Sequence, residues 1–352
     1  MKNIFLILFL FPVIALNAAQ PKQVLFLSPE SSGFKSEEFA KPVISPDGTK
    51  IIFTTKDFSK IFLTTVPAKS SPKPDKPEII IESTNCGLNA RWLNNEKIIF
   101  LASEEGKNNL IFHTICLYNI LEKKTSKLTA PSLEKNNPVI CGNMILIPNS
   151  WGDSSAHSSH LSAKDETDKF LNEIFPVGLS SADEKKSKPF SMIKIENDSV
   201  AVNPDELPEF IYFIDNLKLY RMKTGSGETG EIDDRVYSHA ISPDNKNIAY
   251  CKNNNILIYN IESSSIVDIG EGTLPDWTDE KNIIYVITKD NGHEITSSEV
   301  FSANIDSKNK PVNISASVNE LEYYPSYDKN AGRIYFSSMK NNSIKYFEYK
   351  KK

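Results

Sequence analysis

Histidine and serine are the residue types of this chain that could carry acid–base or nucleophilic chemistry, and their arrangement is unfavourable for it. The chain has 352 residues but only five histidines, and no G-x-S-x-G motif presents a serine as a nucleophile. A separate hydrolase domain would need on the order of 200 further residues, for which the chain has no room. Serine hydrolase chemistry is therefore a poor interpretation.

Two histidines have a spacing that could hold a metal. His157 and His160 form an H-x-x-H pair, but they lie in a serine-rich stretch that is typical of a solvated loop. Together with His239, they are the candidate ligands of a metal-dependent site. No D-x-D-x-D-G loop for calcium is present. We predict no metal and no cofactor, and keep the three histidines as binding candidates.

The cysteines do not form a metal site either. Cys86, Cys116, Cys141 and Cys251 include no C-x-x-C pair, which a zinc site would need. Buried free thiols, or at most one disulfide, are expected, and the pairing cannot be read from four cysteines.

Composition excludes one class of partner. Forty Lys and Arg residues stand against 45 Asp and Glu, which gives a formal net charge of −5. Because there is also no long basic run, we expect no nucleic-acid partner. A hydrophobic share of 39% is that of an ordinary folded protein.

The N-terminus has the layout of a secretory signal peptide. Lys2 precedes an apolar stretch from Ile4 to Leu16, and the small residues Ala18 and Ala19 follow it. The stretch is shorter than the roughly 20 residues that span a bilayer. We predict a signal peptide over residues 1–19, no stable transmembrane segment after its cleavage, and a periplasmic or secreted protein. The alternative is an uncleaved N-terminal anchor.

A repeat runs through the rest of the chain. Each unit is a short apolar strand, a turn, and a second strand rich in Ile, Phe and Tyr. The clearest copies are Pro42–Thr55, Ser199–Ile214 and Ser238–Lys252. Weaker copies are Leu88–Ala102, Pro138–Pro148, Leu274–Thr288 and Tyr323–Ser338. Seven such hairpins predict seven repeated sheets.

The last large apolar residue of each second strand serves as an anchor for the spacing. The anchors are Phe53, Phe100, Ile147, Phe213, Tyr250, Tyr285 and Phe336. Their separations of roughly 35 to 66 residues centre on the length of a four-stranded propeller blade. Further apolar runs supply outer strands, at Ile61–Val66, Ile111–Ile120, Leu217–Met222, Ile256–Ile261, Glu299–Ile305 and Ile344–Tyr349. Helical periodicity is weak, and one short helix is expected near Lys164–Ile174.

The turn of the unit has a geometric explanation. Pro46 fixes φ, Asp47 can accept a hydrogen bond from the amide two residues on, and Gly48 tolerates a positive φ. The same pattern recurs at Pro204 with Asp205 and at Pro243 with Asp244. Because the aspartate recurs from unit to unit, we interpret these residues as structural turns rather than catalytic acids.

These turns carry a family resemblance. S-P-D-G at Ser45–Gly48, S-P-D-N at Ser242–Asn245 and N-P-D-E at Asn203–Glu206 resemble the WD40-like (PD40) propeller repeat. That repeat occurs in the propeller domain of the periplasmic TolB protein and in peptidase propellers. The resemblance covers roughly residues 40 to 350 and implies a disc with loops on two faces and a polar central tunnel.

We therefore predict an all-β fold, a β-propeller of four-stranded blades. Seven blades are favoured and six are the alternative. Residues 20–352 form one domain with an insertion at about 151–197, and Val24–Leu27 joins the last blade to close the ring.

The predicted function is binding. An exported propeller of this kind suits a protein or peptide partner in the cell envelope, and we expect a monomer that is not an enzyme. Trp151, Tyr323 and Tyr324 are candidate binding residues, whereas Trp92 and Trp277 lie eight residues before their anchors and are interpreted as packing between blades. The alternative function is a metal-dependent or carbohydrate-active propeller enzyme such as an oligosaccharide lyase.

Overall fold

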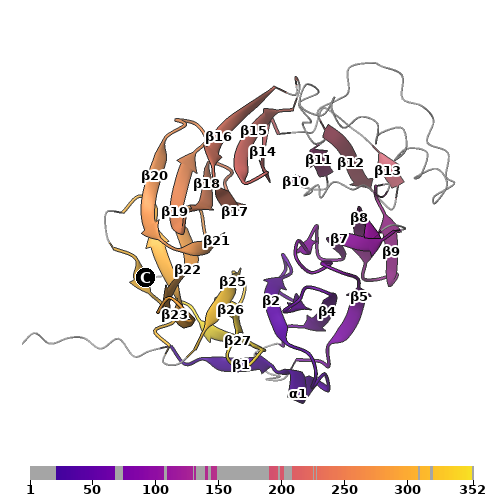
Figure 1. Ribbon diagram of the computed structural model, residues 1–352, viewed down its shortest axis with the longest axis vertical. Coiled ribbons are helices and arrows are strands. Elements are labelled where there is room, and N and C mark those ends of the chain that lie inside the picture. The colour runs from indigo at the N-terminus through magenta and orange to yellow at the C-terminus, as the bar shows by residue number, and fades with distance from the viewer. Residues whose placement is uncertain are drawn as a thin grey trace, which may run out of the picture.

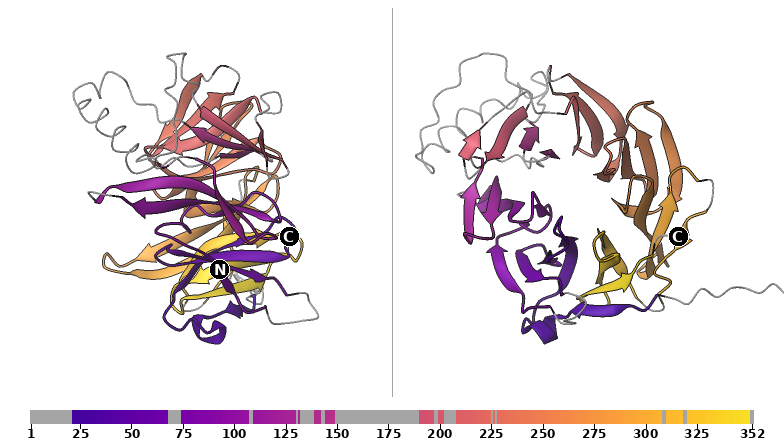
Figure 2. Two further views of the ribbon diagram at one scale, coloured as in Figure 1. Left: turned by 90° about the vertical axis from the view of Figure 1, so that its right-hand side faces the viewer. Right: turned by 180° about the vertical axis from the view of Figure 1, so that it is seen from behind.

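Small antiparallel sheets follow one another around a ring in the computed structural model of the protein (Figure 1). The structure describes residues 21–67, 74–106, 109–129, 131, 139–141, 144–148, 190–196, 199–201, 208–224, 226, 228–307, 310–317 and 320–350. The chain passes once around the ring, and the views from the side and from behind show the sheets arranged around a common axis (Figure 2). The predicted all-β propeller fold is confirmed.

Within this described part, six sheets have four strands and one has three. The first three sheets along the chain are β2 (Phe39–Ile44), β3 (Lys50–Thr55), β4 (Lys60–Thr65) and β5 (Glu78–Glu82); β6 (Arg91–Trp92), β7 (Lys97–Glu105), β8 (Ile111–Asn119) and β9 (Lys124–Lys127); and β10 (Val139–Cys141), β11 (Met144–Pro148), β12 (Phe190–Glu196) and β13 (Ser199–Ala201). The three-stranded sheet is β14 (Phe210–Asp215), β15 (Lys218–Lys223) and β16 (Thr229–Asp234).

The remaining sheets complete the ring. They are β17 (Val236–Ile241), β18 (Asn247–Lys252), β19 (Asn255–Asn260) and β20 (Ile266–Glu271); β21 (Thr273–Trp277), β22 (Asn282–Asp290), β23 (Ile295–Asn304) and β24 (Val312–Asn313); and β25 (Glu322–Asp328), β26 (Arg333–Ser338) and β27 (Ser343–Glu348) with β1 (Val24–Leu27). A single turn of helix, α1 (Pro29–Ser32), connects β1 to β2. The described residues thus form six four-stranded sheets, which matches the alternative prediction of six blades. With the three-stranded sheet β14–β16, the described sheets number seven.

The predicted inner hairpins form in every unit but one. The unit Ser199–Ile214 is the exception, because β13 pairs with β12 and not with β14. Glu196 lies opposite Ser199, so only Asn197 and Asp198 separate the two strands. A two-residue connection of this kind favours a local hairpin over pairing across a longer loop. The predicted turn residues Pro204 and Asp205 lie outside the described residues.

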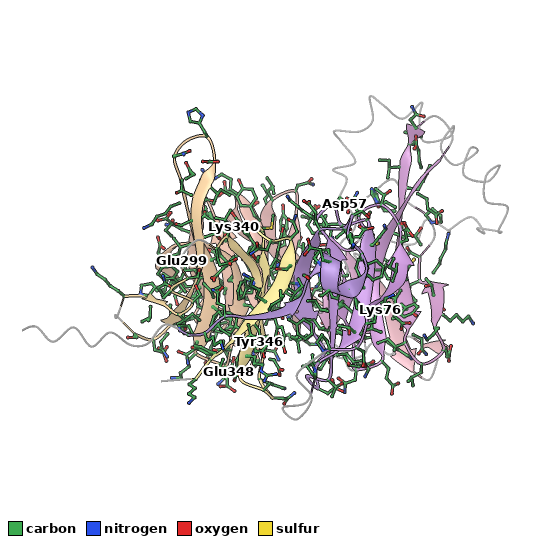
Figure 3. All side chains as sticks on the ribbon, turned by 90° about the horizontal axis from the view of Figure 1, so that it is seen from below. Asp57, Lys76, Glu299, Lys340, Tyr346 and Glu348 are labelled. Atoms are coloured by element: carbon green, nitrogen blue, oxygen red, sulfur yellow. The ribbon has the colours of Figure 1, made fainter. Side chains whose placement is uncertain are left out.

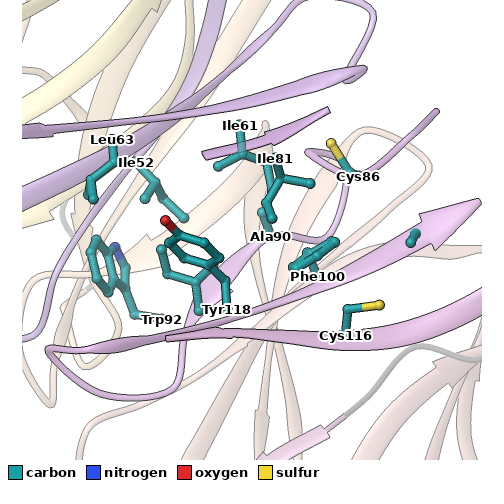
Figure 4. Packing of buried hydrophobic residues seen from close by; sticks show 12 residues of the cluster. Ile52, Ile61, Leu63, Ile81, Cys86, Ala90, Trp92, Phe100, Cys116 and Tyr118 are labelled. Atoms are coloured by element: carbon teal, nitrogen blue, oxygen red, sulfur yellow. The ribbon is translucent and has the colours of Figure 1, made fainter. Parts of the chain in front are cut away.

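Apolar side chains fill the boundaries between neighbouring sheets. The described anchors, such as Phe53, Phe100 and Tyr285, are almost fully buried on their second strands. In Figure 4, Ile52 and Ile61 of the first sheet pack against Phe100 and the other buried residues of the second. Since burying one such side chain is worth about 1.5–3 kcal/mol, these boundaries hold the ring together.

Two tryptophans make the same contact at two of these boundaries. Trp92 ends β6 and donates from Nε1 to the carbonyl of Val43 on β2, at 2.9 Å. Trp277 ends β21 and donates from Nε1 to the carbonyl of Ala240 on β17, also at 2.9 Å. Both indoles are buried, so the prediction that they pack between blades is confirmed.

The turn between first and second strands has the expected hydrogen bonds in two sheets. Asp47 accepts from the Thr49 amide at 3.0 Å and from Ser45 Oγ at 2.7 Å. Asp244 repeats this with the Lys246 amide at 3.2 Å and Ser242 Oγ at 2.6 Å. The third turn position has a positive φ in both, +71° at Gly48 and +58° at Asn245. These are the two residue types that tolerate such backbone at least cost.

The N-terminal strand closes the ring. β1 pairs antiparallel with β27, and Val24 lies opposite Tyr346. Phe26 is 6% exposed and packs edge-on against Tyr335, with ring centroids 5.2 Å apart. The predicted pairing of Val24–Leu27 into the last sheet is confirmed.

Two hairpins are longer than the rest. β7–β8 and β22–β23 have strands of nine or ten residues, whereas the corresponding strands of the first sheet have six. Both extend beyond the ring on the same side, which we call the hairpin face (Figures 2 and 3).

Three predictions concern residues that the structure describes in small part or not at all. The signal peptide over residues 1–19 and the helix expected at Lys164–Ile174 lie outside the described residues. Of the insertion expected at 151–197, the described part is β12, which is the third strand of its sheet. No helix within the described ranges is both long and apolar enough to cross a membrane.

Candidate functional site

The strands β2, β10, β17, β21 and β25 lie nearest the centre of the ring, each at one edge of its sheet (Figure 1). One position on the first strand of a sheet, which we call the inner position, pairs with the residue just before the anchor of the second strand. In five sheets it is occupied by Val43, Arg91, Ala240, Asp276 and Ser326. All five remain partly exposed although they lie deep in the molecule. They are therefore the groups that a ligand at the ring centre would meet.

At two inner positions the side chain completes the backbone hydrogen bonding of the next sheet. A first strand is a sheet edge, so amides on its open side need acceptors. Ser326 Oγ accepts from the amide of Ile44 at 3.4 Å. The carboxylate of Asp276 accepts from the amide of Tyr327 in the same relative place. These two side chains serve the architecture of the ring.

Burial dominates the ionisation of Asp276. It raises the pKa of this carboxyl to about 6, and the hydrogen bonds from the amides of Trp277 and Tyr327 oppose the rise only in part. The carboxyl is therefore still mostly ionised at pH 7 but takes up a proton at a higher pH than an ordinary aspartate, and no cation lies beside it among the described side chains.

Arg91 breaks the pattern of the inner position. A guanidinium has only donors, so it cannot accept an amide of the next sheet as Ser326 and Asp276 do. Burial lowers the pKa of Arg91, and no described carboxylate lies close enough to oppose that effect. Arg91 also takes part in none of the ion pairs found among the described residues.

Lys41 brings a second cation to the same place. It sits at a β-bulge of β2 with φ of +47°, its amide donates to Ser337 Oγ at 2.7 Å, and its ammonium donates to the carbonyl of Leu88. Burial and, after it, the charge of Arg91 lower the pKa of Lys41 to about 8. Two neighbouring cations thus lie inside a protein of net negative charge.

His239 lies within reach of the charge of Arg91. It lies on β17, and burial followed by the charge of Arg91 lowers its pKa to about 4, against a hydrogen bond with the backbone of Tyr212. The imidazole is consequently neutral at pH 7. The structure thus places Lys41 and His239 each near Arg91, and His239 is the only one of the three that the sequence analysis singled out.

The other candidate binding residues have different surroundings. Tyr323 and Tyr324 lie on β25, their rings 6.3 Å apart, and burial raises the pKa of both phenols. Tyr324 also packs edge-on against Phe58, at 6.4 Å between ring centroids. Both tyrosines are partly buried. Trp151, His157 and His160 lie outside the described residues.

A signal for Arg91 was available in the sequence. It immediately precedes Trp92, as Asp276 precedes Trp277, and the two tryptophans stand eight residues before their anchors. A charged residue in a short apolar strand beside a packing residue has to face away from the sheet boundary. Lys41 could not be found in this way, because its orientation depends on the bulge.

Thiol and metal chemistry find little support in the described part of the chain. Cys86, Cys116 and Cys251 are free and buried, and burial raises the pKa of Cys86 and of Cys116 to about 11. Such thiols stay protonated and unreactive at neutral pH. No group of three or more His, Cys, Asp or Glu side chains is placed there to hold a metal ion.

Comparisons with known proteins give distant structural likenesses. No family model and no curated protein matches the sequence. Among solved structures, TolB from Acinetobacter baumannii is 12% identical with a TM-score of 0.40, over 89% of this chain and 63% of that one. The putative TolB from Agrobacterium tumefaciens is 12% identical with a TM-score of 0.41, over 88% and 91%.

A protein of unknown function from Desulfotomaculum acetoxidans is 12% identical with a TM-score of 0.47, over 89% of this chain and 90% of that one. In contrast, this chain spans only 63% of the length of TolB from Acinetobacter baumannii, which is less than two thirds. The propeller assignment rests on the sheet topology.

Proposed function

We propose that the protein is an exported β-propeller that binds a protein or peptide partner in the cell envelope and performs no catalysis of its own. The partner would dock on the hairpin face, where the two long hairpins stand on either side of the ring centre. The observation that carries the proposal is the exposure of apolar side chains on those hairpins.

These side chains are too exposed to stabilise the fold. Leu110 is 39% exposed and Ile111 48% exposed at the end of β7–β8, and Ile295 is 44% exposed on β22–β23. Exposed apolar groups on two hairpins that extend from the same face offer two separate anchor points for another protein. The rigid ring beneath the hairpins holds them at a fixed separation, which favours a pre-organised binding surface.

The ring centre supports binding rather than catalysis. Arg91 and Lys41 are cations held in place by strands of the first two sheets, and His239 is neutral at pH 7. Donors of this kind bind the acceptor groups of a ligand.

A matched pair of double variants tests the docking face. Ile111→Ser with Ile295→Ser removes apolar surface from the hairpins. Ile266→Ser with Val267→Ser removes the same kind of surface from the outer strand β20, where the two residues are 44% and 49% exposed. Wild-type protein immobilised on resin should retain a specific set of proteins from a detergent extract of the envelope.

The hairpin variant should lose these proteins at least tenfold, and the β20 variant should keep them. Equal retention by all three proteins would refute docking on the hairpin face. Export is tested separately by N-terminal sequencing of the purified native protein, which should begin at Gln20. A protein that keeps Met1 and stays in the cytosol would refute export.

A further inference from the structure

Neither cation at the ring centre has a carboxylate partner among the described residues, although both lie deep in the molecule. Removing a guanidinium from water is costly unless a carboxylate or a set of acceptors replaces the solvent. Arg91 has no such carboxylate among the described residues, and its neighbour Lys41 is a second positive charge. The arrangement therefore stores electrostatic repulsion that an anion would relieve.

Their depth in the ring orders the two cations along a path. β2 and β3 run antiparallel, so the start of β2 lies beside the finish of β3. The turn from β3 to β4 is therefore on the same side of the ring as the start of β2. The turn residue Asp57 marks this turn in Figure 3, on the side to which the long hairpins extend. Lys41 lies two residues before the inner position of β2 and is thus nearer the hairpin face, whereas Arg91 occupies the inner position itself.

We propose that Arg91 and Lys41 form an anion site inside the ring, which binds a carboxylate of an acidic peptide segment entering from the hairpin face. Lys41 attracts the acidic segment near the mouth, and the planar fork of Arg91 binds one carboxylate deeper in the ring. Neutral His239 borders the site without adding charge. The peptide as ligand rests on the proposed function, whereas the anion site itself does not.

The geometry assigns Arg91 the larger share of the binding. A guanidinium can give a carboxylate two parallel hydrogen bonds, and it stays charged at any physiological pH. Lys41 already donates one hydrogen bond to the Leu88 carbonyl, so fewer of its donors face a ligand. Loss of Arg91 should therefore weaken binding more than loss of Lys41.

A defined probe tests the site without knowledge of the natural partner. N-acetylated, C-amidated hexaglutamate carries side-chain carboxylates only, and hexaglutamine has the same size without charge. Titration of either peptide into the full-length protein, followed by the Nε–H NMR resonances of its arginines, measures both affinity and place. The Arg91 resonance is identified by its loss in Arg91→Lys.

Hexaglutamate should shift the Arg91 resonance saturably, and hexaglutamine should not. Arg91→Gln should weaken the binding of hexaglutamate at least tenfold, and Lys41→Gln should weaken it severalfold. Lys281→Gln is the control, because it removes the same charge from an exposed lysine in the turn between β21 and β22 of another sheet, where it pairs with Asp306. Arg91→Lys should recover part of the affinity if charge and fork geometry both contribute.

Three outcomes would overturn the proposal. One is an affinity that is the same in Arg91→Gln and wild type, with both proteins folded by near-ultraviolet circular dichroism. Another is equal weakening by Lys281→Gln, which would indicate nonspecific attraction. The third is tighter Arg91-dependent binding of trigalacturonate than of hexaglutamate, which would make the ligand an acidic sugar. If the docking face fails its own test while hexaglutamate still binds at Arg91, the anion site stands and the protein partner does not.

Discussion

Phe26 offers a direct test of how the ring is closed. Its side chain is 6% exposed, contacts the Tyr335 ring, and belongs to the cluster that joins the last sheet to the first. Phe26→Ala should lose about 2–3 kcal/mol of transfer free energy and about 1 kcal/mol of aromatic contact. The expected loss in the free energy of unfolding is therefore about 3–4 kcal/mol, within the range found for buried Phe→Ala changes.

The neighbouring residue provides the control. Leu25 lies on the same strand but is 54% exposed, so Leu25→Ala should change stability by less than about 0.5 kcal/mol. Neither variant removes a backbone hydrogen bond between β1 and β27. Urea unfolding followed by tryptophan fluorescence measures both, since Trp92 and Trp277 are buried. A loss below about 1 kcal/mol for Phe26→Ala, similar to that of Leu25→Ala, would refute closure of the ring by β1.

Two further predictions concern an aspartate and a histidine. Asp244→Ala should lower the free energy of unfolding, measured in urea, by about 1 kcal/mol, because it removes the hydrogen bonds from Ser242 Oγ and the Lys246 amide. Partner binding should be unchanged, and lost binding at unchanged stability would contradict a structural role. His239 has a folded pKa of about 4, below its ordinary 6.5, so the unfolded chain takes up the proton first as the pH falls. Wild type should thus lose up to about 2 kcal/mol relative to His239→Asn between pH 7 and pH 5, and equal slopes would contradict this.

The fold could be predicted because its signals are local and repeated. A turn such as Ser45–Gly48 specifies a hairpin through residues adjacent in sequence, and the anchor Phe53 marks the buried face of the strand that follows. The pairing of Val24–Leu27 with the last sheet could be predicted because both this strand and the edge of that sheet need a hydrogen-bonding partner. The strand Ser199–Ala201 was assigned to the wrong sheet, because its pattern suits either neighbour and a short connection to β12 decides the pairing.

The candidate site was harder to predict. Lys41 and Arg91 lie on different sheets, and their proximity depends on the curvature of the ring and on the bulge at Lys41. No sequence pattern encodes either feature. His157 and His160 were proposed as candidates from residue type and spacing, and they lie outside the described residues.

The pairing of β1 with β27 also sets the order in which the molecule can be completed. Val24 is among the first described residues to be synthesised, and its partner Tyr346 is among the last. Until that partner arrives, β1 and the edge of the growing ring both expose unpaired backbone groups, which are sites for pairing with other chains. A chain that is cut short before β27 therefore lacks more than one strand, because its N-terminal strand has nowhere to bind. Such a chain should be digested by a protease faster than the full chain, because more of its backbone is left unpaired.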